Sequence, residues 1–256
     1  MKWCVFDIET GPLPDEHLQR VCPPWEPTPF NGGKEFDPSE VKVGNLKDQA
    51  KITQKILNAE AAFYAAKKKH DAEQADAKKS HFVNFKDEAA LCVSTGCVLA
   101  IGMYSLQNES FYLMHEDGNE FCLLSEFWRQ YKAAESSQVR MAGLNIFAFD
   151  LPFLIRRSWI LNVNVPKSVC DFTTKWTNWS PVFVDLRKVW QLGDSQAKSN
   201  FDHISQCFET GGKHADMCGK DFATFWHTRR EDAIKYLKQD VSQPAEWIRR
   251  MGLAEA

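Results

Sequence analysis

Apolar residues gather in short runs along the chain, and turn-forming or polar residues separate most of these runs. Short apolar runs that are rich in strand-forming residues predict buried strands. We expect five strands, at residues 2–8, 97–104, 110–114, 139–146 and 182–185. The first run is expected to end at Gly11-Pro12, because both residues disfavour a continued central strand.

Helical patterns occupy much of the rest of the second half of the chain. We expect helices at residues 121–134, at 151–161, from 201 onward, and from about 229 to 251. Pro152 falls in the first turn of its helix, where proline is tolerated. Pro244 lies inside the last helix and predicts a kink or a break. Three neighbouring strands, followed by strands that alternate with helices, predict an α/β fold with helices packed on a mixed sheet.

A long segment with a different composition separates the first strand from the second. Residues 12–45 are rich in proline, and residues 46–80 contain no glycine or proline and are rich in Ala, Lys, Gln and Glu. The second stretch predicts a helix of roughly 50 Å. We therefore expect one domain over residues 1–256 with an insertion at about 12–90. The insertion is interpreted as a structural arm, a contact for nucleic acid or a partner, or a disordered spacer.

Composition limits the class of protein. The chain has 256 residues, 44% of them hydrophobic, and can bury a sizeable core. Its net charge of −3 excludes a generic polyanion binder, although metals and local basic patches could still allow nucleic acid to bind. The eight cysteines form no C-x-x-C pair, which is typical of reduced thiols in a cytoplasmic protein. No apolar run reaches the ~18 residues of a membrane span, so we expect no membrane contact.

Two carboxylates lie at the end of the first predicted strand. Asp7 and Glu9 are two residues apart, so their side chains point to the same face. Neighbouring carboxylates repel each other and resist burial unless a cation lies between them. Hard oxygen ligands suit Mg²⁺ or Mn²⁺. The alternative is a strand end that carries two solvated acids.

Two further segments carry acids beside apolar or helical elements. Tyr236 and Asp240 are four residues apart and therefore share one face of a helix. A phenol one turn from a metal-binding carboxylate can orient a water molecule. Asp150 follows an apolar run and could equally cap the helix that begins after it. Taken singly, these two segments also fit a half-buried tyrosine, a surface acid and a helix cap.

The three segments together resemble a known family. Their order and flanking residues are those of the DEDD exonucleases, a group within the ribonuclease H-like superfamily that includes polymerase proofreading domains. The segments are Phe6-Asp7-Ile8-Glu9-Thr10, Asn145-x4-Asp150-Leu-Pro-Phe-Leu and Tyr236-x3-Asp240. The tyrosine resembles the DEDDy branch. Phe201-Asp202-His203-Ile204 and Gly211-Gly212-Lys213 are similar to a connecting region in the exonuclease domain of family B polymerases. The resemblance covers residues 1–11 and about 92–250.

The resemblance implies a ribonuclease H-like fold and a role for each acid. The fold is a mixed five-stranded sheet flanked by helices, with a long helical insertion after the first strand. Asp7, Glu9 and Asp240 would hold one Mg²⁺ or Mn²⁺ ion, and Asp7 would also bind a second. Asp150 would support the second ion through water. Tyr236 would position the attacking water, which completes a catalytic set of five residues.

The resemblance also implies contacts to the substrate. The backbone around Thr10 and the side chain of Asn145 would contact the terminal nucleotide, with Phe149 and Lys213 as further binding residues. The implied activity is a 3′–5′ exonuclease that acts mainly on single-stranded DNA and releases nucleoside 5′-monophosphates. The same site would serve an exoribonuclease, and a catalytically idle nucleic-acid-binding or scaffold domain is a third interpretation. An endonuclease is disfavoured by the tyrosine. The sequence does not indicate an oligomeric state.

A second metal pattern lies between the last helices. His203, Cys207, His214 and Cys218 form an H-x3-C…H-x3-C arrangement that zinc could use. The absence of C-x-x-C and the apolar helical surroundings favour core packing instead.

Overall fold

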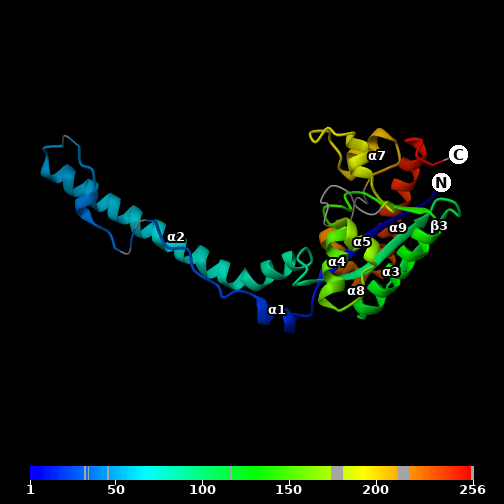
Figure 1. The fold of residues 1–256 in the computed structure, drawn as a ribbon. Coiled ribbons are helices and arrows are strands. Elements are labelled where there is room, and N and C mark those ends of the chain that lie inside the picture. Colours follow the sequence, from blue (N-terminus) through cyan, green and yellow to red (C-terminus); the bar gives the residue numbers. More distant parts are fainter. Residues whose placement is uncertain are drawn as a thin grey trace. The chain divides into compact units, whose positions relative to one another are not determined.

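The computed structural model describes residues 1–31, 33, 35–44, 46–115, 117–173, 181–212 and 219–254. The chain divides into two compact units (Figure 1). One unit combines Met1–His17 with Asp87–Ala256, and the other is Leu18–Lys86. The assignment of both to one domain remains a prediction. None of the helices in the described residues is both long and apolar enough to cross a bilayer.

The larger unit is built on a mixed five-stranded sheet, as the sequence predicts. The strand order is β3-β2-β1-β4-β5, and β1 is antiparallel to β2 and parallel to β4. The strands are β1 (Lys2–Pro12), β2 (Gly96–Ser105), β3 (Ser110–Met114), β4 (Val139–Gly143) and β5 (Phe183–Asp185). The central position of β1 places its residues between the two halves of the sheet.

Two strand ends differ from the expectation. β1 continues through Pro12, because Gly11 and Pro12 still pair with the start of β2. β4 is three residues shorter than expected and ends at Gly143. A Cβ atom on Gly143 would lie 2.5 Å from the Phe6 carbonyl oxygen, so the two strands approach more closely there than other residues allow. Asn145 then adopts φ 64 and turns the chain out of the sheet.

Helices cover both faces of the sheet, and the two faces of β1 differ. Phe6 and Ile8 pack in a core with α3 and α4, whereas Trp3 and Val5 pack in a second core with α7 and α9. The helices of this unit include α3 (Glu120–Ser136), α4 (Asp150–Ile160), α5 (Lys167–Thr173), α6 (Leu186–Gln191), α7 (Phe201–Cys207), α8 (Phe222–Thr228) and α9 (Arg230–Arg250), with a 3-10 turn η2 (Gly219–Asp221) before α8. The α9-facing side of β1 is thus apolar where the strand begins.

The last helix differs from the expectation in one respect. Of the kink or break predicted at Pro244, the break does not occur, since α9 runs from Arg230 to Arg250 without interruption. Pro244 is buried, and Val241 and Ala245 on either side of it pack in the core with β1. Pro244 has no backbone N–H group to donate within the helix, so packing against the core holds α9 together at this point.

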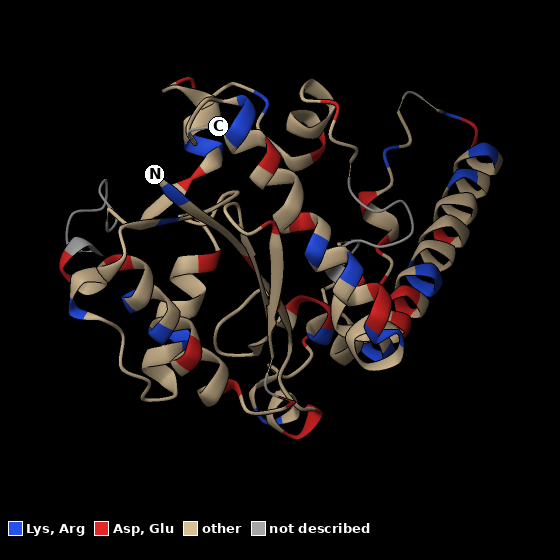
Figure 2. Cartoon of the chain, turned by 90° about the vertical axis from the view of Figure 1, so that its right-hand side faces the viewer, with Lys and Arg blue, Asp and Glu red and all other residues tan. Residues whose placement is uncertain are grey.

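The smaller unit contains most of α2 (Gln49–Ala89), which is longer than the predicted helix, and the chain that precedes it. Phe63 on α2 contacts both Phe30 and Phe36, with ring centroids 5.5 and 5.7 Å apart. Further along α2, Gln74 accepts a hydrogen bond from the Thr28 N–H at 2.9 Å. A disordered spacer therefore does not describe these residues. Short groups of Lys and of Glu or Asp follow one another along α2, so both signs of charge are present on it (Figure 2). The unit also holds the 3-10 turn η1 (Pro38–Glu40), and α1 (Asp15–Val21) spans the boundary.

Gly102 allows α9 to pack closely against the sheet. It pairs with Asp7 across β1 and β2, and a Cβ atom on it would lie 2.7 Å from Leu237 Cγ. We predict that Gly102→Ala destabilises the protein by about 1–3 kcal/mol, because the added methyl group overpacks this contact. Thermal or urea unfolding measures the change. The double variant Gly102→Ala/Leu237→Val should recover part of the stability that Gly102→Ala loses. If the stability changes of the two single variants simply add in the double variant, the explanation is wrong.

Candidate active site

The acidic end of β1 provides one side of the site. Asp7 and Glu9 continue the face of β1 that carries Trp3 and Val5, because side chains alternate along a strand. The pairing register shifts between Glu9 and Thr10, which is the signature of a β-bulge in β2. Bulges bend a strand locally and redirect its side chains. The bulge comes after both carboxylates, so the change on this face of β1 from Trp3 and Val5 to Asp7 and Glu9 follows from the alternation of side chains alone.

Helix α9 provides the other side of the site. Tyr236 and Asp240 lie one helical turn apart and both face β1, as their spacing predicts. Tyr236 is only 2% exposed, and Asp240 is also buried. A carboxylate oxygen from each of Asp7, Glu9 and Asp240 lies within 4.8 Å of the others. Two elements more than two hundred residues apart in sequence thus bring three acids into one small volume.

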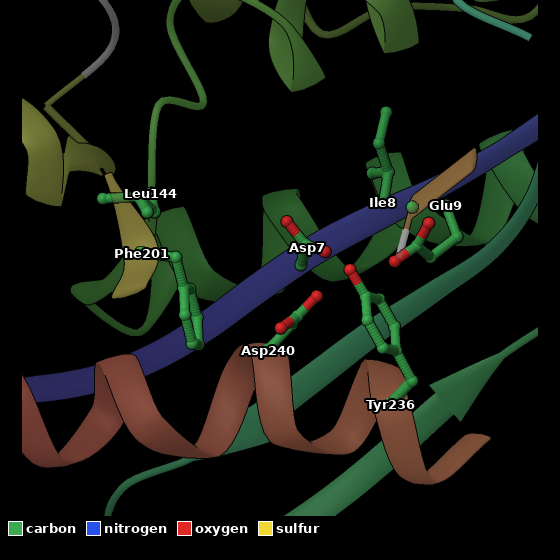
Figure 3. Close-up of a pocket in the computed structure, with 8 residues that line it drawn as sticks. Asp7, Ile8, Glu9, Leu144, Phe201, Tyr236 and Asp240 are labelled. Atoms are coloured by element: carbon green, nitrogen blue, oxygen red, sulfur yellow. The ribbon is translucent and has the colours of Figure 1, made fainter. Parts of the chain in front are cut away.

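These side chains line a cavity of about 200 Å³. Figure 3 shows the Tyr236 hydroxyl group directed toward the carboxylates of Asp240 and Glu9, with Asp7 on β1 beside them. The remaining lining is apolar. It consists of Ile8, Leu144, Phe201 and Gly219. The cavity therefore has an acidic half and an apolar half.

The acidic group around Tyr236 controls its ionisation. Burial raises the pKa of the Tyr236 phenol above its usual value, and the negative charges of Asp240, Glu9 and Asp7 raise this pKa further. The phenol therefore stays protonated at neutral pH and forms a hydrogen bond with Asp240. Such a group can donate or accept a hydrogen bond, but it does not act as a base.

Three carboxylates at this distance suit a divalent cation. Like charges in a buried site destabilise one another unless protons or a cation neutralise them. Carboxylate oxygens are the ligands that Mg²⁺ and Mn²⁺ prefer. The donor set of Asp7, Glu9 and Asp240 therefore fits such an ion, and the structure brings together these three predicted ligands.

Asp150 occupies a different position from the other acids. It is 4% exposed, and its Oδ1 accepts a hydrogen bond from the backbone N–H of Ile8 at 3.3 Å. Burial raises the pKa of its carboxyl group to about 7, and the charge of Asp185 adds to the effect. Among the described residues, the group of three acids that could share an ion does not include Asp150. Its carboxylate instead contacts the backbone of β1 at Ile8, the residue between Asp7 and Glu9.

The predicted substrate-binding residues are spread around the cavity. Thr10 is buried after the register shift in β1. Asn145 directly follows the lining residue Leu144, and its side chain is bound by a neighbouring arginine. Phe149 packs against Phe153, with ring centroids 5.5 Å apart, at the edge of a hydrophobic core. Lys213 lies outside the described residues.

The zinc hypothesis is tested only in part. Cys207 Sγ lies 3.7 Å from His203 Nε2, one helical turn away on α7. His214 and Cys218 lie outside the described residues, so zinc binding by these four side chains stays a prediction.

Sequence reasoning missed a polar network beside the site. Asp185 is buried at the end of β5, and its carboxylate accepts hydrogen bonds from the backbone N–H groups of Asn145, Phe147 and Arg187. Arg187 in turn donates to the side chain of Asn145. An acid that directly ends a predicted strand, two residues before an arginine, was the available signal. Leu144 carries no such signal, because apolar residues are expected in any core, whereas Phe201 belongs to a segment that the resemblance already singled out.

The comparisons with known proteins agree with this geometry. A family model described as "Predicted 3'-5' exonuclease related to the exonuclease domain of PolB" matches residues 84–245. The match covers more than half of the chain, and the chain belongs to this family. It is a nuclease-like hydrolase family that implies a nucleic acid substrate and divalent metals. The matched region includes Asp150, Tyr236 and Asp240, whereas the structure adds Asp7 and Glu9 from outside it.

A solved structure supports the fold. The family B DNA polymerase from the hyperthermophilic archaeon Pyrobaculum calidifontis is similar over 98% of the present chain, with a TM-score of 0.50 and 12% sequence identity. The present chain spans 24% of the length of that polymerase chain. The likeness confirms the predicted α/β fold of the ribonuclease H-like type. No curated protein matches the sequence.

Because the three acids repel one another, we expect removal of one of them to stabilise the metal-free protein and to weaken metal binding. We expect Asp240→Asn to raise the melting temperature in EDTA, because it removes one of three mutually repelling charges. The same change should weaken Mn²⁺ binding about tenfold or more, since it removes a charged ligand. Calorimetric titration and thermal unfolding measure the two effects. Asp87→Asn, at an exposed position on α2, is the control. Equal Mn²⁺ affinity in Asp240→Asn and the control would rule out this ligand set.

The environment of Asp150 predicts a pH dependence. Its folded pKa of about 7 lies above the ordinary value of 3.8, so its contribution to stability is fully present below about pH 3.8 and is lost as the pH rises through 7. We expect Asp150→Asn to become progressively more stable than wild type between pH 5.5 and 8.5 in EDTA, with the difference levelling off above pH 7. Urea unfolding across this range measures it, and a difference independent of pH contradicts the assignment.

Proposed function

We propose that the protein is a Mg²⁺- or Mn²⁺-dependent 3′–5′ exonuclease that acts mainly on single-stranded DNA and releases nucleoside 5′-monophosphates. The observation that carries the proposal is the convergence of Asp7, Glu9, Asp240 and Tyr236 in one cavity. Membership of the exonuclease family supports the reaction class. The choice of DNA rests on the relation of that family to the exonuclease domain of PolB.

The acids would hold the metal ions. Asp7, Glu9 and Asp240 form the group that fits one ion, with Asp7 shared by a second, and Asp150 would support the second ion through water. When bound, two such ions would supply an activated water and charge stabilisation for the leaving 3′ oxygen. The burial of Asp150 and its contact with the Ile8 backbone N–H are consistent with an indirect role.

Tyr236 would orient the attacking water. Its phenol stays protonated because burial and the nearby carboxylates raise its pKa. When the hydroxyl hydrogen is donated to Asp240, the oxygen lone pairs remain available to accept a hydrogen from water. In this role the tyrosine fixes the direction of the water and does not remove its proton.

The apolar half of the cavity would accept the terminal nucleotide. Leu144 and Phe201 lie beside Asp7 and Asp240 (Figure 3) and offer carbon surface next to the charged groups. Sugar and base faces of an unpaired nucleotide suit such a surface, while its phosphate would face the metal ligands. The backbone around Thr10 and the side chain of Asn145 would complete the binding of this nucleotide, with Phe149 and Lys213 as further contacts.

The proposal is tested with single-stranded oligodeoxynucleotides labelled at either end. We expect stepwise shortening from the 3′ end and release of mononucleotide, dependent on Mg²⁺ or Mn²⁺. Asp7→Ala should lower the rate at least about 100-fold, because several kcal/mol of charge stabilisation are lost. Tyr236→Phe should lower it about tenfold, whereas Tyr64→Phe at an exposed position on α2 should not change it.

Three outcomes contradict this function. Activity that survives Asp7→Ala excludes the acidic cavity as the site. Cleavage that begins at the 5′ end, or that opens a closed circular strand, excludes a 3′ exonuclease. Faster hydrolysis of the matching oligoribonucleotide would assign the same site to RNA.

A further inference from the structure

Arg187 contacts the predicted substrate-binding residue Asn145 in a way that determines how Asn145 can act. Its Nη1 donates a hydrogen bond to the Asn145 side-chain oxygen at 3.0 Å. A guanidinium group has donors and no acceptor, so it can bind only the oxygen of an amide. The orientation of the Asn145 amide is thereby fixed, and its NH₂ group points away from Arg187.

The Asn145 NH₂ group is available for a ligand. Among the described residues, none accepts a hydrogen bond from it. Asn145 is partly exposed and directly follows Leu144, which lines the acidic cavity. The side chain therefore offers two donors next to the place where the substrate is proposed to bind, and its oxygen is already engaged by Arg187.

The surrounding structure holds both partners rigidly. The Asp185 carboxylate accepts the backbone N–H groups of Asn145 and Arg187 at 2.9 Å each, and that of Phe147 at 3.1 Å. The Nε of Arg187 donates to the buried Ser199 hydroxyl at 3.0 Å. Asn145 itself has φ 64, a left-handed conformation that asparagine tolerates better than most residues. Asp185 thus holds the turn after β4, and the Arg187 guanidinium group holds the side chain of Asn145.

We propose that Arg187 is a positioning residue that sets the polarity of Asn145, so that Asn145 recognises a hydrogen-bond acceptor on the substrate, such as a sugar, phosphate or base oxygen of the terminal nucleotide. Asp185 holds the backbone on which this pair depends. The proposal rests on the proposed function for the identity of the substrate. It adds a residue pair that neither the acidic cavity nor the family description assigns.

The test compares two ways of removing the donor. Arg187→Met releases the amide, and Asn145→Asp keeps the size and the Arg187 contact but replaces the NH₂ group by an acceptor. We expect both variants to raise KM for a short single-stranded oligodeoxynucleotide roughly tenfold or more. The kcat should change less than about twofold, because a contact made equally to substrate and transition state affects KM alone. Arg187→Lys should recover part of the loss.

One control separates the positioning role of Arg187 from the effect of an added charge, and a second separates it from a loss of protein stability. Ala148→Asp places a negative charge on the same turn at an exposed position and measures the effect of charge alone. Mn²⁺ affinity should stay within about twofold of wild type in Arg187→Met, because Arg187 contacts none of the three grouped acids. A wild-type KM in Arg187→Met, with only a lower melting temperature, overturns the proposal. So does an Asn145→Asp effect no larger than that of Ala148→Asp.

The positioning role can still be tested if the protein turns out not to be an exonuclease. Wild-type protein is assayed first, and absence of mononucleotide release rejects the proposed function. The same variants are then compared by fluorescence anisotropy with the same oligonucleotide in Ca²⁺. Weaker binding by Arg187→Met and Asn145→Asp than by wild type and Ala148→Asp supports the positioning role without any turnover. Equal binding by all four proteins, or binding by none, overturns it.

Discussion

The close packing of α9 on the central strands is the constraint on which the site depends. Asp7 and Glu9 lie on β1, whereas Tyr236 and Asp240 lie on α9. Neither pair forms the site by itself. Gly102 on β2 removes the side chain that would stand between the sheet and Leu237 of the helix. The carboxylate oxygens lie within 4.8 Å of one another only because the helix and the sheet pack at this short distance.

This packing creates an electrostatic conflict that apolar contacts must overcome. The α9-facing side of β1 begins with Trp3 and Val5, which pack in a buried core with Val241 and Trp247. The same side ends with carboxylates that repel one another. Hydrophobic burial at one end of the interface thus forces charges together at the other end. Such a site is stabilised when a cation binds, which links metal binding to the stability of the whole unit.

Around this centre, buried polar groups fix the loops. Asp150 accepts the N–H of Ile8 in the acidic strand, and Asp185 accepts three N–H groups of the neighbouring turn and helix. A buried acceptor with several donors costs little when all are paired, and it leaves the backbone few alternatives. The turn that carries Asn145 is therefore determined by residues in β5 and α6, not by its own sequence alone.

The sequence by itself determined the strands, most helices, the mixed sheet and the family, because these depend on local periodicity and on three motifs with fixed spacing. It also predicted that Asp7 and Glu9 share a face, and likewise Tyr236 and Asp240, since both follow from the geometry of one strand or one helix. The family resemblance also implied that Asp7, Glu9 and Asp240 share one ion apart from Asp150. Other features needed the folded chain: β4 ends early at Gly143, α9 continues through Pro244, and Arg187 binds the side chain of Asn145. Each of these depends on contacts between distant segments, where packing distance and paired polar groups outweigh local preference.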